Sequence, residues 1–208
     1  PFIISLGQLE FAENVIILIN TNKGITGYGE CSPFMTINGE SQETCLVVAR
    51  YLAKVLIGKN PINIAECSAL MDKVIYGNSS IKSAFDMALY DIAAKDAGQS
   101  LYQYLGGNND KEIVTDYTIS LDNPEKMAED ARWIRDHGYE IIKVKLGHSK
   151  EQDLECIHKI RQAIGPDVLL RADANQGWSV ENAPGILQEL AQYDIQHCEE
   201  PIPRCEFM

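Results

Sequence analysis

The sequence has no long apolar run and few basic residues. The aliphatic run at residues 15–19 has the length of one strand, far short of the ~18 residues of a membrane helix. Lys and Arg number 18 against 30 Asp and Glu, which gives a net charge of −12. Nucleic-acid binding depends on basic side chains that neutralise phosphates. We therefore predict neither a membrane nor a nucleic-acid partner.

Signatures of several other protein classes are missing as well. The six cysteines show no C-x-x-C spacing and the N-terminus shows no signal-peptide pattern, so we expect buried thiols in a cytoplasmic protein. The four histidines lack metal-ligand spacing, and no serine lies in a G-x-S-x-G context. Gly27 and Gly29 are not followed by the helix that a dinucleotide site requires.

The pattern of apolar residues divides the chain near residue 112. Residues 1–112 predict an α+β domain, with a hairpin turning at residues 22–24 and helices over 41–57, 62–75 and 80–97. From residue 113 strands and helices alternate, which favours a parallel sheet. The first strand is expected at 114–120, and the following helices are expected to begin near Asn123, Ser149 and Ser179.

Three strand-like runs of this second part end in charged residues. The runs are residues 139–145, 168–175 and 195–201. Lys145 and Asp173 are 28 residues apart, and Asp173 and Glu199 are 26 apart. A (β/α)₈ barrel has about 31 residues per unit and carries its chemistry at the C-terminal ends of its strands. The spacing therefore predicts a TIM-type barrel with these charges at its mouth.

Strand alternation indicates what the charged residues could do. Lys143 and Lys145 share one face of their strand, and Asp173 and Asn175 share one face of the next. Converging lysines and carboxylates suggest a Mg²⁺ site beside a lysine base, since Mg²⁺ prefers oxygen ligands. Such a site suits the removal of a proton next to a carboxylate. Alternation alone does not decide whether Glu199 or Glu200 is the ligand.

Each motif alone has an ordinary structural explanation. K-x-K is typical of a solvated strand edge, D-x-N of a turn, and E-E-P of a strand that ends at proline. All three explanations would have to hold together, in this order and at this spacing.

The combination resembles the enolase superfamily. The K-x-K, D-x-N and E-x-P motifs at residues 143–145, 173–175 and 199–201 are similar to those of its muconate lactonizing enzyme subgroup. Within that subgroup the chain resembles dipeptide epimerases of the L-Ala-D/L-Glu type. Residues 27–33, 39–44 and 101–107 extend the resemblance into the N-terminal part. The resemblance implies an α+β capping domain at 1–112 followed by a (β/α) barrel, of which 113–208 is about the first half.

The resemblance also implies roles for single residues. Lys145 would be the acid/base and Lys143 its electrostatic partner. Asp173 and Glu199 would hold Mg²⁺, with Asn175 and Glu200 as second-shell residues. The side chains expected to contact the substrate are Thr118, Phe34 and Ile37.

The capping domain is expected to supply two loops that close over the barrel mouth. They correspond to residues 4–8 and 32–38. Phe34, Met35 and Ile37 are apolar for a surface loop, which favours a lid over a small or apolar substrate side chain.

The resemblance implies a Mg²⁺-dependent dipeptide epimerase that acts through an enediolate, with L-Ala-Glu as the default substrate and a hydrophobic second residue as the alternative. The same motifs fit an o-succinylbenzoate synthase, an N-acylamino acid racemase or a cycloisomerase. A non-catalytic barrel protein is a third alternative, which the inward charges disfavour. About four barrel strands fall within the chain, so a third metal ligand and a second catalytic lysine are expected beyond residue 208. Homo-oligomerisation is left open.

Overall fold

The computed structural model describes residues 2–207, which form two compact units. Residues 12–111 make up the capping unit, and residues 2–11 and 112–207 make up the barrel unit. The two units meet in the sequence at residues 111 and 112, and the N-terminal residues 2–11 belong to the barrel unit. Residues 2–11 group with the barrel unit because Ile3 and Leu121 share a 3.0 Å backbone hydrogen bond and Ile3 N also bonds to Ser120 Oγ.

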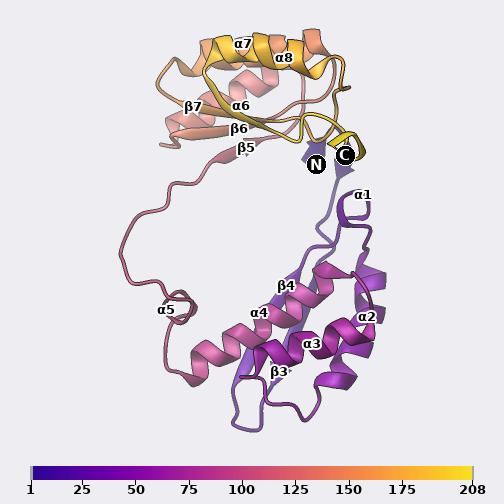
Figure 1. Ribbon diagram of the computed structural model, residues 1–208. Coiled ribbons are helices and arrows are strands. Elements are labelled where there is room, and N and C mark those ends of the chain that lie inside the picture. Colours follow the sequence, from indigo (N-terminus) through magenta and orange to yellow (C-terminus); the bar gives the residue numbers. More distant parts are fainter. Residues whose placement is uncertain (1, 208) are drawn as a thin grey trace. The chain divides into compact units, whose positions relative to one another are not determined.

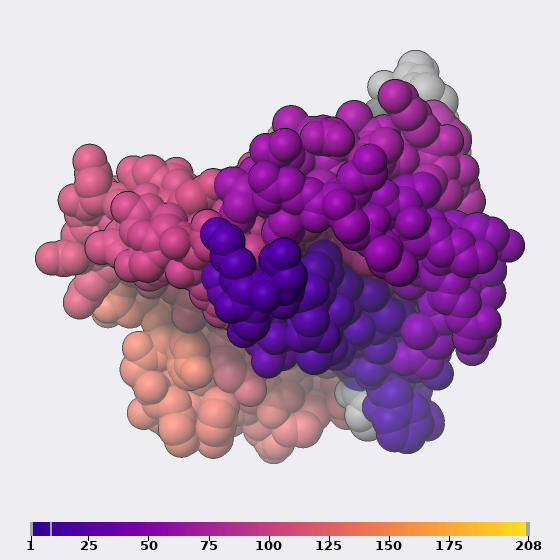
Figure 2. All heavy atoms as spheres, turned by 90° about the horizontal axis from the view of Figure 1, so that it is seen from below, coloured from indigo at the N-terminus to yellow at the C-terminus, as the bar shows by residue number. Residues whose placement is uncertain are grey.

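The capping unit contains one antiparallel hairpin with helices packed on it. Strands β3 (Val15–Asn20) and β4 (Thr26–Cys31) pair from Val15 opposite Cys31 to Asn20 opposite Thr26. The helices are α1 (Met35–Asn38), α2 (Gln42–Leu56), α3 (Ile64–Val74), α4 (Ser79–Asp96) and α5 (Leu101–Tyr104). The predicted hairpin and three long helices are present (Figure 1). Figure 2 shows indigo atoms of the first part of this unit at the surface, beside purple atoms of its helices.

Close contact between α4 and β4 holds this unit together. A Cβ atom on Gly29 would lie 1.8 Å from the carbonyl oxygen of Ala84, and one on Gly27 would lie 2.2 Å from that of Ala88. Only glycine permits this approach of a strand to a helix backbone. The core beside it contains Leu52 and Ile81, both fully buried.

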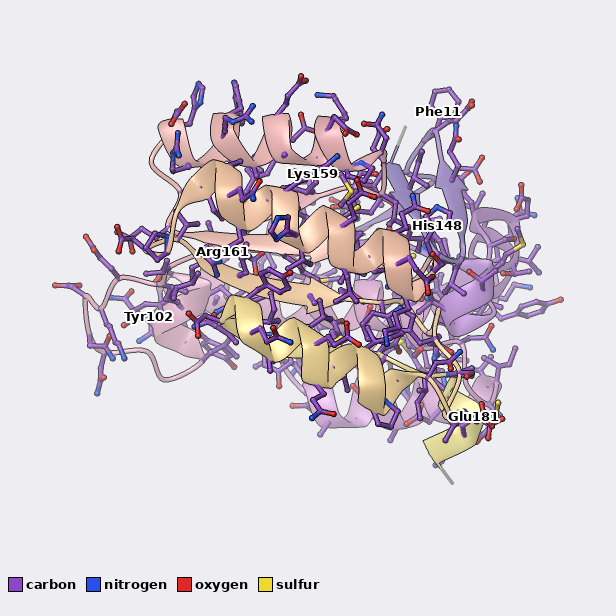
Figure 3. The ribbon with its side chains drawn as sticks, turned by 90° about the horizontal axis from the view of Figure 1, so that it is seen from above. Phe11, Tyr102, His148, Lys159, Arg161 and Glu181 are labelled. Carbon is purple, nitrogen blue, oxygen red and sulfur yellow. The ribbon has the colours of Figure 1, made fainter. Side chains whose placement is uncertain are left out.

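The barrel unit is a parallel sheet covered by helices. Its elements are β1 (Phe2–Ile4), β2 (Gly7–Leu9), β5 (Tyr117–Ile119), α6 (Pro124–Asp136), β6 (Ile141–Lys145), α7 (Lys150–Ile164), β7 (Leu169–Asp173), α8 (Ala183–Leu190), η1 (Ala191–Tyr193), β8 (Ile195–Glu199) and η2 (Arg204–Phe207). The sheet order is β5-β6-β7-β8, and β1 pairs with β2 as a separate antiparallel ribbon. Figure 3 shows α6, α7 and α8 side by side over the sheet. The parallel-sheet prediction is confirmed.

Among residues 2–207, four of the eight α-helices begin at a side-chain cap: α2, α5, α6 and α7. The Asn123 side chain accepts the N–H of Lys126 at 2.9 Å, with Pro124 in the first helical turn. Ser149 Oγ accepts the N–H of Gln152 at the start of α7. Two boundaries differ from prediction. Strand β5 covers only Tyr117–Ile119, and α8 begins at Ala183 because Ser179 first forms a turn in which its carbonyl accepts the Ala183 N–H.

Candidate functional site

The charged residues lie at the C-terminal ends of adjacent strands because the strands pair in register. Lys145 pairs with Asp173, and Asp173 pairs with Glu199. Ile142, Val144 and Leu146 alternate with the lysines along β6 and are completely buried in the core. This apolar side fixes the strand's orientation, so both lysines point to the opposite side of the sheet.

The two lysines and two carboxylates form one connected cluster. Lys145 Nζ lies 2.7 Å from Asp173 Oδ2, and Lys143 Nζ lies 2.9 Å from the same oxygen. Lys143 Nζ also lies 2.5 Å from Glu199 Oε2. Asp173 is 1% exposed and Lys145 is 8% exposed, whereas the side chain of Glu199 is 52% exposed. The cluster therefore has a buried end at Asp173 and an accessible end at Glu199.

The cluster shifts the proton equilibria of its members. Burial alone would raise the pKa of Asp173, but hydrogen bonds from Lys145, Lys143 and the Asn175 N–H outweigh it, and the pKa is lowered. Burial disfavours the ammonium of Lys143, yet Glu199 and Asp173 overcome this effect and raise its pKa. Both shifts stabilise the charged forms, so Asp173 is held as a carboxylate.

The turn after β7 is hydrogen-bonded to the N-terminal segment through Ser5. Asn175 and Gln176 have positive φ angles of 44° and 66°, which asparagine tolerates better than most residues. The Asn175 N–H donates to Asp173 Oδ1 at 3.0 Å. Ser5 Oγ lies 3.0 Å from the carbonyl oxygen of Ala174 and 2.7 Å from that of Asn175. Residues 4–8, predicted to be part of a lid, thus contact the D-x-N turn through Ser5.

The two adjacent glutamates point to different partners. Glu199 contacts Lys143, whereas Glu200 accepts from Gln176 Nε2 at 3.1 Å and lies 3.5 Å from Arg204 Nε. The structure thus separates them, with Glu199 in the cluster and Glu200 beside the turn.

The remaining predicted residues fall into two groups. Thr118 pairs with Lys143 in the sheet and is partly buried, so it lies next to the cluster. Phe34 and Ile37 belong to the capping unit, where Ile37 is 42% exposed. Their role at the substrate stays a prediction. Elsewhere on β7, Arg171 Nη1 lies 2.9 Å from Asp116 Oδ2.

Sequence reasoning missed two residues near this site. The Phe2 ring centroid lies 5.8 Å from Lys145 Nζ, a cation–π arrangement. Asp153 is completely buried and accepts the indole N–H of Trp178 at 2.7 Å. An acidic residue in the first turn of a helix usually interacts with the positive end of the helix dipole at the surface. The position of Asp153 in the sequence therefore did not indicate that its side chain is buried.

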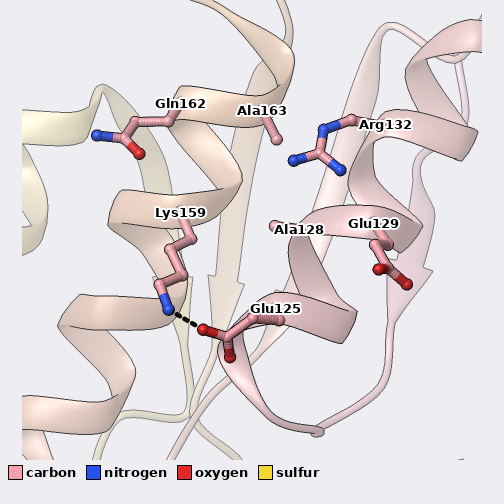
Figure 4. Close-up of a pocket in the computed structure, with 7 residues that line it drawn as sticks. All are labelled: Glu125, Ala128, Glu129, Arg132, Lys159, Gln162 and Ala163. Carbon is pink, nitrogen blue, oxygen red and sulfur yellow. Dashed lines mark hydrogen bonds and ion pairs between the residues drawn. The ribbon is translucent and has the colours of Figure 1, made fainter.

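A separate groove of about 490 Å³ lies between α6 and α7 (Figure 4). Its lining is largely polar and includes Arg132 and an ion pair between Glu125 and Lys159. None of the strand-end residues lines it, so the groove belongs to the helix layer. Among residues 2–207 no group of three His, Cys, Asp or Glu side chains is arranged to hold a metal ion.

No helix among residues 2–207 has the length and apolar character needed to cross a bilayer.

An N-terminal capping domain followed by part of a parallel-strand barrel defines a known class of protein. Residues 1–106 match the mandelate racemase / muconate lactonizing enzyme N-terminal domain, and residues 126–207 match the enolase C-terminal domain-like family. The chain belongs to the mandelate racemase / muconate lactonizing enzyme family, within the enolase superfamily. The resemblance drawn from its motifs is thereby confirmed.

Two curated relatives match nearly the whole chain. A D-Ala-D/L-Ala epimerase from Cytophaga hutchinsonii is 60% identical over 204 residues, which are 98% of this chain and 55% of the relative. A hydrophobic dipeptide epimerase from Enterococcus faecalis is 38% identical, over 98% of this chain and 57% of the relative. The chain thus spans little more than half the length of these relatives.

A solved structure shows the same fold. The dipeptide epimerase of Cytophaga hutchinsonii, complexed with Mg and D-Ala-L-Val, superposes with a TM-score of 0.97 at 59% identity. The match covers 100% of this chain and 56% of that one.

Proposed function

We propose that the full-length protein is a Mg²⁺-dependent dipeptide epimerase that removes and returns the α-proton of the C-terminal residue of a dipeptide. The observation that carries the proposal is the cluster of Lys143, Lys145, Asp173 and Glu199 at the ends of three adjacent strands. It joins candidate bases to candidate metal ligands. The names of the relatives support the choice of dipeptides.

The donor set fits a hard divalent cation. Asp173 and Glu199 are carboxylates on neighbouring strands in register, and the Oδ1 atom of buried Asn175 has no hydrogen-bond partner among the described residues. Mg²⁺ takes oxygen ligands and keeps several waters, so Asp173 and Glu199 would hold it together with ligands from the rest of the protein, and Asn175 would orient them from the second shell. Bound there, Mg²⁺ would act as a Lewis acid on the substrate carboxylate.

The lysines of this chain would carry out the proton transfer on one face of the substrate. Lys145 is the buried member and reaches only the side of the sheet that holds Asp173. It would take the α-proton of one epimer as a neutral amine and, as an ammonium, return a proton to that face. Lys143 is less buried and bridges Asp173 and Glu199. Its raised pKa keeps it cationic, so it would stabilise negative charge on the substrate.

The substrate we propose is a dipeptide with a small or apolar second residue. The relative that is 60% identical is named for D-Ala-D/L-Ala, and the 38% identical one for hydrophobic dipeptides. The apolar residues Phe34 and Ile37 are in keeping with this choice. These observations favour D-Ala-L-Ala over the L-Ala-Glu default that the family resemblance implies.

A deuterium-exchange screen tests the proposal. The full-length protein with Mg²⁺ in D₂O should incorporate deuterium at the α-carbon of the C-terminal residue of D-Ala-L-Ala, measured by mass spectrometry. L-Ala-L-Glu and N-succinylamino acids form the comparison set. Incorporation into N-succinylamino acids and into no dipeptide would replace the epimerase with the racemase.

A further inference from the structure

Asp153 is a buried carboxylate that the proposed chemistry does not use. It is 0% exposed, and no Lys or Arg among residues 2–207 forms an ion pair with it. Its Oδ2 accepts from Trp178 Nε1 at 2.7 Å and from Gly147 N at 3.0 Å, and its Oδ1 accepts from His148 N at 3.3 Å. Burial raises its pKa against these three bonds. An unpaired buried carboxylate is costly, so a specific role is expected.

Its partners come from two different loops. Gly147 and His148 follow β6, and Trp178 follows β7. His148 is labelled in Figure 3. Asp153 itself lies in the first turn of α7. One carboxylate therefore ties the loop after the lysine strand to the loop after the aspartate strand.

The two loops are in direct backbone contact. Gly147 has a φ of +106°, and a Cβ atom there would lie 2.3 Å from the carbonyl oxygen of Ala174. A Cβ atom on Gly177 would lie 2.4 Å from the carbonyl oxygen of Gly147. No side chain fits between the loops, so their separation is set by the backbone and by the bonds to Asp153.

The contact between the two loops is close in sequence to Lys145 and Asp173. Gly147 lies two residues after Lys145, and Trp178 lies five residues after Asp173. Between them the Leu146 N–H donates to the Asp173 carbonyl at 2.9 Å. A change in the loop separation would therefore move Lys145 relative to Asp173.

Building on the proposed function, we infer that Asp153 is a positioning residue. It holds the loops after β6 and β7 together so that the Lys145 ammonium stays opposite Asp173. Its three accepted hydrogen bonds need two acceptor oxygens that carry no hydrogen. An asparagine would turn an NH₂ group toward one set of these donors, at almost the same volume.

The test uses the full-length protein and two variants. Asp153→Asn removes the double acceptor, and Trp178→Phe removes only the indole donor. Asp130→Asn is the matched control, because Asp130 is partly exposed on α6 and forms a surface ion pair with Lys126. We expect Asp153→Asn to lower kcat for dipeptide deuterium exchange by ~10- to 100-fold, as misplacement of a catalytic group does. KM should change by no more than roughly twofold, because binding contacts remain. Asp130→Asn should change neither.

Two measurements test the geometry without turnover. In NMR spectra of ¹⁵N-tryptophan-labelled protein, the indole N–H signal of Trp178 is the one that disappears in Trp178→Phe. This signal should shift in Asp153→Asn and should stay in place in Asp130→Asn. A crystal structure of Asp153→Asn should show a Lys145 Nζ to Asp173 Oδ2 separation different from the 2.7 Å found here.

The outcomes separate this inference from the proposed function. Wild-type kcat in Asp153→Asn, or an unchanged Lys145–Asp173 separation, would overturn the positioning role. If Asp153→Asn does not fold, Trp178→Phe decides by the same kcat and KM criteria. If the wild-type protein exchanges no dipeptide, the proposed function fails, and the signal shift and the crystallographic distance still decide the positioning role.

Discussion

Lys145 Nζ lies 2.7 Å from Asp173 Oδ2, and their two residues pair directly across the parallel strands β6 and β7. The contact is made at the C-terminal edge of the sheet, where the next strand adds Glu199. Strand β6 thus presents a candidate base, and β7 and β8 present candidate metal ligands.

Asp173→Asn should abolish Mg²⁺ binding and exchange activity in the full-length protein. The substitution removes the charge that both lysines neutralise and that the metal would require. Isothermal calorimetry with Mg²⁺ and the D₂O assay measure the two effects, and circular dichroism checks the fold. Full activity with unchanged Mg²⁺ affinity would remove Asp173 from the metal site.

Lys145→Ala should stop α-proton exchange from one epimer of the dipeptide only. General acid/base groups contribute roughly 10²- to 10⁴-fold, and in the proposed function Lys145 would act on a single face of the substrate. The measurement is deuterium incorporation into each pure epimer. Lys159→Ala, on the surface of α7, is the control and should retain both rates. Wild-type exchange from both epimers in Lys145→Ala would exclude it as the acid/base.

The adjacent glutamates offer a matched pair. Glu199→Gln should weaken Mg²⁺ binding far more than Glu200→Gln, because Glu199 lies in the cluster and Glu200 binds Gln176 and Arg204. Both changes remove one charge from neighbouring positions. Calorimetric Mg²⁺ titrations compare them directly, and the reverse order would identify Glu200 as the ligand.

Two Gly→Ala changes should have opposite effects on stability. Gly29→Ala places a methyl group 1.8 Å from the Ala84 carbonyl oxygen, and such overpacking costs about 1–3 kcal/mol or more. Gly185→Ala meets nothing within 4 Å on the exposed side of α8, and should gain roughly 0.5–1 kcal/mol from helix propensity. Urea unfolding of the full-length variants measures both. Equal midpoints would contradict the tight α4–β4 contact.

Cys45 and Cys156 should resist alkylation in the native protein. Burial raises the pKa of each thiol to about 12, so at pH 8 almost no reactive thiolate is present. Iodoacetamide labelling followed by mass spectrometry, with and without urea, measures the protection. Rapid labelling of Cys156 at pH 8 without urea would show that the α7 core is not closed around it.

For the six cysteines, the sequence predicts the redox state of the thiols better than their burial. All six are free thiols, as expected without a disulfide framework. Four are buried, whereas Cys198 is partly buried and Cys205 is exposed. Reduced thiols follow from spacing, but burial depends on which strands and helices cover each residue.

Regular alternation made β6 predictable and an irregularity made β8 ambiguous. Along β6 every second residue is apolar, so the side that holds Lys143 and Lys145 follows from the sequence. Between β7 and β8 the register shifts, with Leu170 opposite Ile195 and Ala172 opposite Cys198. The extra residue in β8 breaks the two-residue period. Strand alternation therefore could not choose between Glu199 and Glu200.

The sequence by itself determined the local features of this protein: the hairpin, the helix starts at Asn123 and Ser149, and the spacing of Lys145, Asp173 and Glu199. These depend on short-range periodicity, turn chemistry and capping, which act within a few residues. Tertiary structure alone decided that residues 2–11 group with the barrel unit, that Arg171 pairs with Asp116, and that Asp153 links two loops. Such contacts join residues far apart in the chain, and they form only after the buried faces of the strands and helices have packed together.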